Sequence, residues 1–551
     1  MSATAVNPRR AVIQRGSATH RLYPGRVSLR RPKPESLLAW GAAAVGAIGI
    51  ASALTPEFAN RYDVVKGVLP PGVPTAARVF ALAFGIALVW LSRSLARRKQ
   101  RAWQLAVAVV VASAIAHLAK GLDFEESMIS LLLLAALLRW RRHFDVPGDP
   151  RAIRPVLVIA IGAAAAASST VGIELRGADL PERVGDLLTA VGVLAGFTVL
   201  GLWLRPLSEA VAQTVGERRI ARELVEQYGS DSLSFFALRR DKSFFFSPTR
   251  RAFLAYRVVS GAALVSGDPV GDAAEFDALL AEFRRVAHAR GWRLAILGAS
   301  RESLPLYERL GMRAIAIGNE AVMRPEAFSL EGRSIRKVRQ SVSRLTKAGY
   351  SFRVVAADDV DAGLRADLEA VSAVWRGNQV ERGFSMAMDD LYAEGTMFAV
   401  AVSPDGEVGG FMHMAPSPAG GGWTLSTMRR RPATPNGLME FLVVETLAWA
   451  KECGVAEVSL NFCALADFLS PELAVTVSRR VLRRALLSAD SVFQLERLHS
   501  FSRKFHPDWR PRYLCVEKLG DLPLVGLAYL RVEQLLTPPS RWRKRVPVSH
   551  L

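Results

Sequence analysis

Apolar residues come in long uninterrupted stretches over the first 204 residues of the chain. A helix of about 20 apolar residues crosses the hydrocarbon core of a bilayer, and most of these stretches approach that length. We therefore predict an α-helical membrane bundle of six helices over residues 36–204. The stretches run over roughly 37–54, 75–92, 103–120, 126–140, 155–173 and 185–204.

The segments between these stretches alternate in charge, and this alternation predicts their orientation. Segments 93–101 and 139–154 are rich in arginine, whereas 121–126 is acidic. Residues 1–35 are also basic and lack apolar periodicity, so we interpret them as a disordered tail. By the positive-inside rule the tail and the basic loops are cytoplasmic. An even number of spans then places everything after residue 205 in the cytoplasm, and we expect a multi-pass protein of the plasma membrane.

After a helical linker over 205–230 the pattern changes to short strand-like runs and amphipathic helices. The first half of this region, residues 231–330, alternates between the two. We expect strands at 251–259, 262–266 and 292–297, helices at 273–290 and through Leu310, and a further strand after Gly311.

The second half, residues 331–551, repeats this order around 397–463. Alternating runs at 397–402 and 407–414 flank Pro404-Asp405-Gly406, which is typical turn chemistry. A third strand at 423–428 leads into a basic loop, a helix over 438–452 that ends before Gly454, and a strand over 455–461. We therefore predict two copies of one α/β unit, followed by a basic C-terminal tail. A loop that enters a helix N-terminus beside strand ends favours a ligand site there.

The composition indicates that the protein also has an anionic binding partner. Half of the 551 residues are hydrophobic, yet the formal net charge is +20. A membrane part joined to a part that meets nucleic acid or anionic lipid explains both values. The three cysteines form no CxxC pair, the eight histidines do not cluster, and no GxxxxGK[ST] occurs. We expect reduced thiols, no metal site and no nucleotide hydrolysis.

Several motifs resemble those of one known family. They are Asp241-Lys242-Ser243-Phe244-Phe245-Phe246-Ser247, Gly267-Asp268-Pro269-Val270-Gly271, Arg382-Gly383-Phe384-Ser385, Met428-Arg429-Arg430, Pro435-Asn436-Gly437-Leu438-Met439-Glu440-Phe441 and the run from Lys504 to Tyr513. In order and spacing they resemble the phosphatidylglycerol lysyltransferase family, over residues 36 to about 530. The resemblance implies transfer of an aminoacyl group, lysyl or alanyl, from aminoacyl-tRNA to phosphatidylglycerol or a related lipid. We expect the flippase spans of larger members to be absent.

A further motif, Leu306-Tyr307-Glu308-Arg309-Leu310-Gly311-Met312, resembles the helix-to-strand corner of acetyltransferase-like (GNAT) folds. It implies that the two α/β units are tandem GNAT domains, with Tyr307 facing an acyl group. A core tyrosine beside a C-capping glycine explains the same residues.

Acyl transfer to a hydroxyl needs positive charge near the oxyanion and a proton acceptor for the attacking group. Arg429 is predicted to stabilise the oxyanion or to hold a lipid phosphate, and Glu440 and Glu381 are predicted to accept a proton or bind the α-amine. Surface ion pairs explain these glutamates equally well. In the family an aspartate usually precedes the arginine by three positions, and here that residue is Ser426. Asp389 and Asp390 are candidate replacements.

Two sets of residues are predicted to bind the substrates. The substrate-binding candidates are Lys504, Asn436, Gly437, Asn461, Trp509 and Arg512. The tRNA-binding candidates, which recur at helical spacing, are Arg336, Lys337, Arg339 and Arg344. Helix capping by Asn436 and a solvated helix face are the simpler explanations.

Two other functions compete with transfer from tRNA. Coenzyme A binding is disfavoured, because the loop from Arg431 to Gly437 contains two prolines, which lack N–H donors; we expect no cofactor. Ser426 favours the second alternative, a membrane-tethered pseudoenzyme that binds tRNA or anionic lipid without transfer.

Overall fold

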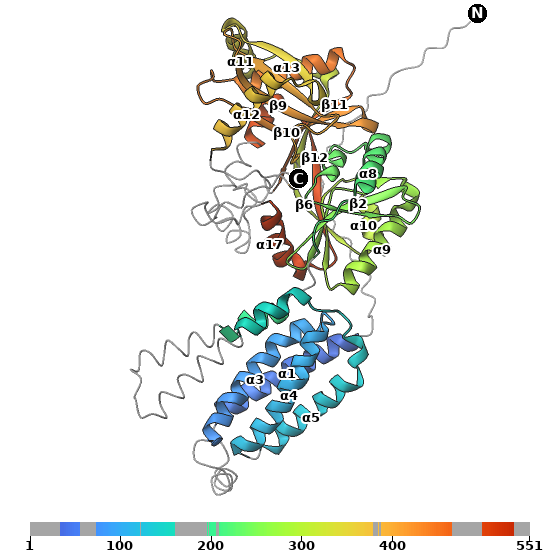
Figure 1. Ribbon diagram of the computed structural model, residues 1–551, viewed down its shortest axis with the longest axis vertical. Helices are drawn as coiled ribbons and strands as arrows, with labels where there is room; N and C mark the ends of the chain where they lie inside the picture. Colours follow the sequence, from blue (N-terminus) through green and yellow to red (C-terminus); the bar gives the residue numbers. More distant parts are fainter. Residues whose placement is uncertain are drawn as a thin grey trace, which may run out of the picture.

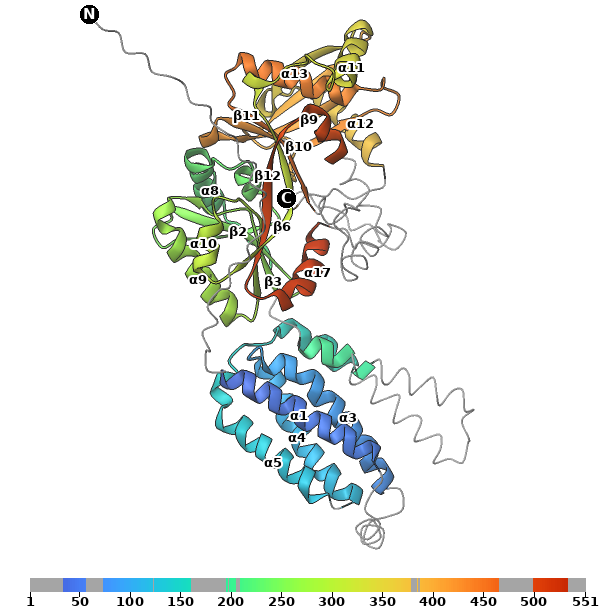
Figure 2. The same cartoon turned by 180° about the vertical axis from the view of Figure 1, so that it is seen from behind.

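The computed structural model describes residues 33–55, 73–121, 123–159, 195–196, 198–204, 209–377, 384, 387–464 and 499–533. A helical bundle forms one end of the molecule, and a region built on a single mixed β-sheet forms the other (Figures 1 and 2).

Four long helices pack side by side in the bundle: α1 (Pro34–Leu54), α3 (Val73–Leu95), α4 (Gln100–Gly121) and α5 (Phe124–Arg139). Gly46 of α1 and Gly85 of α3 lie so close that a Cβ on Gly46 would be 2.6 Å from the Gly85 carbonyl oxygen. Small residues at such a contact let helix backbones approach, which is typical of helices that pack inside a membrane.

The outer surface of the bundle carries large apolar side chains, among them Trp40, Ile115 and Leu132. By length and composition, α1 and residues Gln100–Leu118 of α4 can cross a membrane, and Phe80–Leu95 is a shorter apolar helix. The first four predicted stretches are therefore helices. The fifth and sixth, 155–173 and 185–204, lie largely outside the described residues, so the six-span topology and its orientation stay predictions.

The first half of the sheet region follows the predicted order. Within the predicted linker, α8 (Val215–Tyr228) begins with a capping box between Thr214 and Glu217. The other elements are the 3₁₀ turn η3 (Ser234–Leu238), β1 (Ser243–Phe246), β2 (Ala252–Val259), β3 (Ala262–Ser266), β4 (Val270–Gly271), α9 (Phe276–Ala289), β5 (Arg293–Ala299), α10 (Leu304–Arg309) and β6 (Arg313–Met323).

The second half also confirms the predicted strands and helix around 397–463. Its elements are α11 (Arg336–Lys347), β7 (Ser351–Ala356), α12 (Ala362–Arg376), β8 (Met397–Val402), β9 (Val408–Ser417), β10 (Gly422–Arg430), α13 (Leu438–Glu452), β11 (Glu457–Ala464), the 3₁₀ turn η9 (Arg503–Phe505), β12 (Asp508–Val516) and α17 (Leu522–Val532).

The two halves exchange their last strands in a 12-stranded sheet of order β1-β2-β3-β5-β12-β6-β11-β10-β9-β8-β7, with β4 paired to β2. Strand β12 of the second half lies between β5 and β6 of the first, and β6 pairs with β11 of the second. The sequence predicts two consecutive units but does not reveal this exchange. As a consequence, neither half completes its own part of the sheet.

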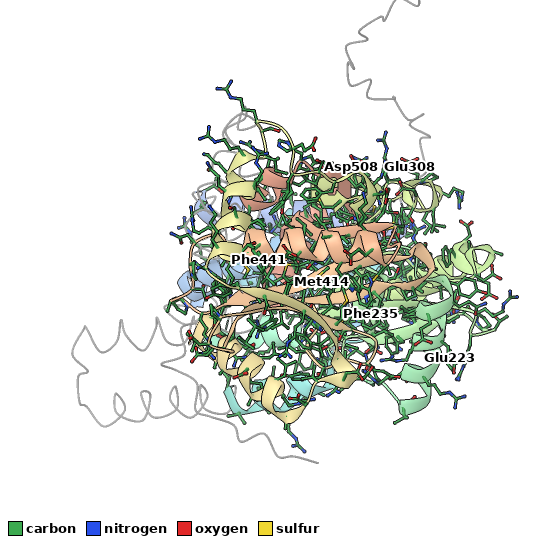
Figure 3. All side chains as sticks on the ribbon, turned by 90° about the horizontal axis from the view of Figure 1, so that it is seen from above. Glu223, Phe235, Glu308, Met414, Phe441 and Asp508 are labelled. Carbon is green, nitrogen blue, oxygen red and sulfur yellow. The ribbon has the colours of Figure 1, made fainter. Side chains whose placement is uncertain are left out.

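Helices cover both faces of the sheet. In the first half α9 and α10 cover one face and α17 the other. In the second half α11 and α13 pack on the face that carries Met412 and Met414. Helix α12 packs on the opposite face, against Phe398 and Phe411. Figure 3 shows Met414 of β9 between Phe441 of α13 and Phe235 of η3.

Candidate functional site

The parallel strands β10 and β11 pair over a short stretch and then separate. Their register runs from Gly422↔Glu457 to Thr424↔Ser459. Strand β10 then bulges between Leu425 and Thr427. We call the stretch beyond Thr424 and Ser459, where the two strands no longer pair, the strand split. It lies toward the carboxyl ends of parallel strands, where ligands of α/β proteins bind.

Asn461 holds the strand split at its start. It adopts a left-handed backbone conformation, with φ of 69°. Its Nδ2 donates to the carbonyl oxygen of Leu425 at 2.7 Å, and its backbone N–H donates to Ser459 Oγ. The predicted substrate-binding residue Asn461 therefore bridges the two strands where they part.

Arg429 lies beyond the split on the face covered by α12, opposite Phe411 in the strand register. Its side chain is buried, and its Nε donates to Thr427 Oγ1 at 3.4 Å. The fully buried imidazole of His413 lies against Phe398, with the two rings tilted and their centroids 5.1 Å apart. Burial, and secondly the charge of Arg429, lower the pKa of His413 to about 3. This face therefore holds a buried guanidinium beside a neutral imidazole.

Ser426 is the extra residue of the β10 bulge. Its Oγ accepts the backbone N–H of Met388 at 2.9 Å. The proposed replacements for the missing aspartate follow Met388 directly. However, Asp389 accepts the backbone N–H of Arg240, and Asp390 forms an ion pair with the Arg240 side chain at 2.9 Å. Both carboxylates are thus engaged by one arginine.

Glu440 and Lys504 lie on the other face of the sheet and contact each other. Lys504 Nζ is 2.7 Å from Glu440 Oε1, on the side covered by α13. The sequence analysis groups Arg429 and Glu440 in one site, whereas Arg429 lies on the face of β10 that α12 covers and Glu440 lies on α13, which covers the other face. The ion pair that the sequence leaves open for this glutamate is present, with Lys504 as its partner.

The loop that enters α13 is fixed by its own polar groups and by α11. Gly437 begins the helix with φ of 102°, a conformation that favours glycine, and a Cβ there would lie 2.6 Å from that of Ser341. The carbonyl oxygen of Asn436 accepts from Arg344 NH1 at 2.9 Å. Asn436 does not cap the helix with its side chain. The loop therefore joins α13 to the basic helix α11.

The four tRNA-binding candidates are all exposed on or near this basic helix. Val338 and Leu345 are buried against α13, so the charged side chains point outward. Arg339 donates to the carbonyl oxygens of Leu330 and Gly332. Arg336 and Lys337 form no ion pair with a described residue. The helix thus presents exposed positive charge beside the N-terminus of α13.

Arg512 and Trp509 contribute to the packing of β12. Arg512 is buried between Glu320, to which its Nε donates at 2.8 Å, and Asp231, at 2.7 Å. The Trp509 ring stacks on His499 at 4.8 Å. Arg512, predicted to bind substrate, is therefore saturated by protein carboxylates.

The predicted acyl-facing tyrosine, Tyr307, is a core residue. It is buried, and its hydroxyl donates to Asp268 at 2.6 Å. Gly311 follows the helix with φ of 73°, as a C-capping glycine does. The simpler explanation of that motif is the one that the structure supports. Glu381 lies outside the described residues.

Lys242 is a buried cation that the sequence did not single out, although its motif carries part of the resemblance. Its Nζ donates to the Phe236 carbonyl oxygen at 2.6 Å and to Ser266 Oγ at 2.7 Å. It also lies 4.9 Å from the ring centroid of Phe384, three residues after Glu381. Burial, and then the charge of Arg239, lower the pKa of Lys242 to about 7. Only tertiary structure reveals its burial, as it does for His413.

Comparisons with known proteins agree with the resemblance. The family model described as phosphatidylglycerol lysyltransferase, C-terminal, matches residues 222–516. That segment begins within α8 and ends with β12, so it contains the whole sheet. The solved structure of L-PGS from Bacillus licheniformis is similar with a TM-score of 0.54 and 25% identity, over 59% of this chain and 98% of that one.

Two curated relatives share the name lysylphosphatidylglycerol biosynthesis bifunctional protein LysX. The protein of Rhodococcus jostii is 35% identical over 363 residues, which is 65% of this chain and 32% of the relative. The protein of Mycolicibacterium vanbaalenii is 30% identical over 586 residues, which is 94% of this chain and 52% of the relative. The chain therefore spans about a third to a half of the length of these relatives. Because the family model covers more than half of it, the chain belongs to the phosphatidylglycerol lysyltransferase family.

Proposed function

We propose that this protein is a membrane-bound transferase that moves a lysyl group from aminoacyl-tRNA to a hydroxyl of phosphatidylglycerol. The names of the relatives refer to lysylphosphatidylglycerol, which favours lysyl over alanyl as the transferred group. We also propose that each half of the sheet region is a GNAT-like unit, since each contains antiparallel strands, a helix and a parallel strand in that order.

The strand split is the observation that carries this proposal. On one face it adjoins the N-terminus of α13 and the basic helix α11, and on the other it adjoins buried Arg429. A donor carried on RNA and an acceptor from the membrane are large and chemically different. If the two substrates approach the strand split from opposite faces, each has its own side of the sheet.

On the donor face, the exposed cations of α11 suit the phosphates of an acceptor stem. Their side chains are long and lack carboxylate partners among the described residues, so they can pair with phosphate oxygens and release counterions. In the neighbouring loop the N–H groups of Arg431 and Thr434 are already bonded to carbonyl oxygens. They are not available to hold a pyrophosphate, which argues for RNA rather than coenzyme A as the carrier.

On the acceptor face, Arg429 supplies the positive charge that ester transfer requires. Attack of a lipid hydroxyl on the aminoacyl ester places negative charge on the former carbonyl oxygen. A buried guanidinium stabilises that charge strongly, because little water screens it. Glu381 remains the proposed proton acceptor, since Glu440 lies on the opposite face in an ion pair with Lys504.

Transfer of labelled lysine tests the proposal. Membranes that contain the protein should move label from lysyl-tRNA into the lipid fraction, and mass spectrometry of that lipid identifies amino acid and acceptor together. RNase treatment should abolish the signal, and a lysyl thioester of coenzyme A should give none. Unlabelled lipid in the presence of folded protein and intact donor would refute the proposal.

The alternative is a membrane-tethered pseudoenzyme that binds tRNA or anionic lipid without transfer. Ser426 favours it, because the serine takes the place of a carboxylate and both neighbouring aspartates are engaged by Arg240. In the same assay a pseudoenzyme would retain labelled tRNA on the membrane but would leave the lipid unlabelled.

A further inference from the structure

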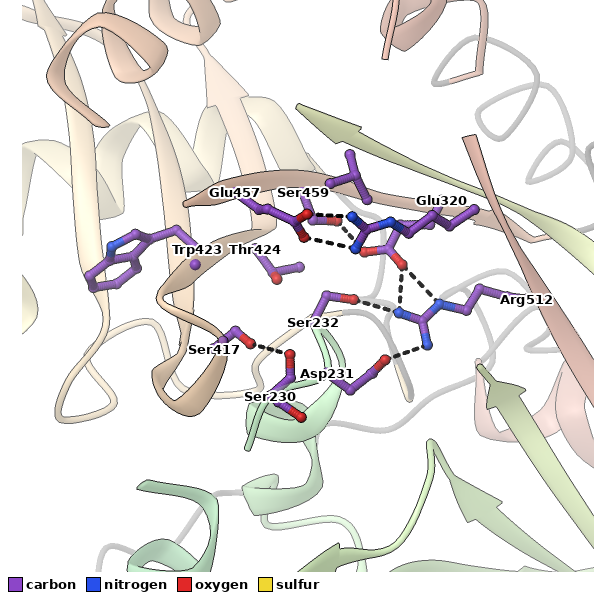
Figure 4. A pocket seen from close by; sticks show the side chains of 14 residues that line it. Ser230, Asp231, Ser232, Glu320, Ser417, Trp423, Thr424, Glu457, Ser459 and Arg512 are labelled. Atoms are coloured by element: carbon purple, nitrogen blue, oxygen red, sulfur yellow. Dashed lines mark hydrogen bonds and ion pairs between the residues drawn. The ribbon is translucent and has the colours of Figure 1, made fainter. Parts of the chain in front are cut away.

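A polar cavity of about 60 Å³ lies at the closed end of the strand split, where β10 and β11 are still paired. Thr424 and Ser459 of these strands line it, together with Asp231, Ser417 and Glu320 (Figure 4). A single water needs about 10–15 Å³ of such a cavity. The cavity therefore has room for a small polar group together with water.

The cavity wall carries more carboxylates than guanidinium groups. Glu320 and Asp231 share Arg512, and Glu457 pairs with Arg510. These three carboxylates and two arginines are the charged residues that line the cavity. Burial raises the pKa of Asp231, and the nearby carboxylates of Asp268 and Glu320 raise it further, against the opposing effect of Arg512. A raised pKa favours the neutral form of Asp231, so the wall is rich in oxygen acceptors rather than strongly negative.

Thr424 supplies a second, independent indication of a ligand. Its side chain is 1% exposed, and its Oγ1 has no hydrogen-bond partner among the described residues. A buried hydroxyl without a partner is costly, so such a group commonly meets a ligand or water. Figure 4 shows it between Ser459 and Ser232, on the wall of the cavity. The Ser417 hydroxyl already donates to the carbonyl oxygens of Gly229 and Ser230, so its lone pairs are left to accept.

We propose that this cavity binds the side-chain ammonium of the transferred amino acid, and so selects a primary amine on a flexible stem, as in lysine or ornithine. The inference rests on the proposed function. An ammonium group offers three donors to a site lined by hydroxyl and carboxyl oxygen acceptors. Thr424 precedes the bulge residue Ser426 by two positions, roughly 7 Å along a strand. The four-carbon stem of lysine matches that step when its ester carbonyl lies at the strand split.

Thr424→Val tests the proposal, because valine keeps the shape and removes only the unpartnered hydroxyl. Thr446→Val is the matched control: Thr446 of α13 is also fully buried, its hydroxyl has no partner among the described residues, and it does not line the cavity. The assay compares kcat/KM for lysyl transfer with that for a mischarged alanyl-tRNA donor. We expect Thr424→Val to lower lysyl transfer about tenfold or more and to leave alanyl transfer unchanged. Thr446→Val should change neither.

Ser417→Ala provides a second variant, which should also lower lysyl transfer and leave alanyl transfer unchanged, but by a smaller factor. Thermal unfolding of each variant verifies that it is folded. Equal loss of lysyl and alanyl transfer in Thr424→Val, or no loss of either, would overturn the ammonium site while leaving the transferase function intact. Absence of transfer from any aminoacyl-tRNA by the wild type would instead overturn the proposed function, and the ammonium site with it.

Discussion

Arg429 and Arg430 are adjacent in sequence but differ in environment. Arg429 is buried on the face of β10 that also holds His413, whereas Arg430 is half-buried and bonds to Thr434 in the loop before α13. Adjacent residues of a strand point to opposite faces of the sheet, so the two guanidinium groups lie in different environments. The sequence identifies Arg429 through its motif, but only the strand register shows which of the two arginines is buried beside the imidazole.

Substitution of these arginines should separate catalysis from loop packing. We expect Arg429→Ala to lower lipid labelling by about 10²- to 10³-fold, the usual effect of removing a group that stabilises an oxyanion. Arg430→Ala should retain most of the activity, because it removes only a partly exposed contact with Thr434. The measurement is the initial rate of label transfer at matched protein levels. Similar rates for wild type and Arg429→Ala would show that Arg429 has no role in the reaction.

His413 should make the fold sensitive to acid. Its pKa in the folded state is about 3, well below that of an unfolded histidine near 6.5. The unfolded chain therefore binds an extra proton as the pH falls below about 6.5, and the folded state does not until about pH 3. Stability present at neutral pH is lost in that window, at about 1.4 kcal/mol per pH unit.

Comparison of His413→Phe with the wild type at pH 7 and pH 5 measures this loss. The wild type should lose about 2 kcal/mol more unfolding free energy than the variant over this interval, read from denaturant midpoints in detergent. His143→Gln, a change at a partly exposed histidine of the bundle, should keep the wild-type dependence. An identical acid loss in His413→Phe and wild type would show that another group is responsible.

At the scale of elements, the order of strands and helices could be predicted from periodicity and turn residues. The predicted bounds of β3 and of α13 match those in the structure. The pairing of β12 with β5 could not be predicted, because the local sequence pattern of a strand does not show which strand from the other half will pair with it. The same exchange brings Arg512 of β12 to Glu320 of β6 and Asp231 of the first half, which explains why a residue predicted to bind substrate holds the two halves together.

Strand β12 offers a matched pair for testing this interpretation. Arg512 and Arg510 lie on the same strand, and both pair with carboxylates, but their side chains are 5% and 43% exposed. Arg512→Met leaves buried Glu320 and partly buried Asp231 without their cation and should cost about 3–5 kcal/mol of stability. Arg510→Met breaks a partly exposed pair and should cost at most about 1 kcal/mol. Equal midpoints of chemical unfolding for the two variants would contradict a central role for Arg512.

At the scale of the whole molecule, an apolar bundle carries a sheet whose two faces differ in chemistry. Composition predicts a membrane part joined to a part with a charged partner, since high apolar content and a net charge of +20 rarely occur together in one soluble domain. It could not predict that the candidate residues divide between the faces of the sheet. The sequence motifs group Arg429, Glu440 and Lys504 in one site. In the structure, however, Arg429 of β10 lies on one face of the sheet, and Glu440 of α13 pairs with Lys504 on the other. The basic surface of α11 and the buried arginine of β10 should therefore respond to different substrates.

Charge reversal on α11 tests that division. The double variant Arg336→Glu/Lys337→Glu should raise KM for lysyl-tRNA and leave KM for lipid unchanged, because the residues lie on the donor face. The slope of log affinity for tRNA against log salt should become shallower by about 0.7–0.9 for each phosphate that the variant no longer neutralises. Arg301→Glu/Lys518→Glu makes the same change of charge at two exposed positions outside α11, one before α10 and one after β12. If both double variants weakened tRNA binding equally, net charge rather than α11 would attract the RNA; a rise confined to the α11 variant would place the donor on that helix.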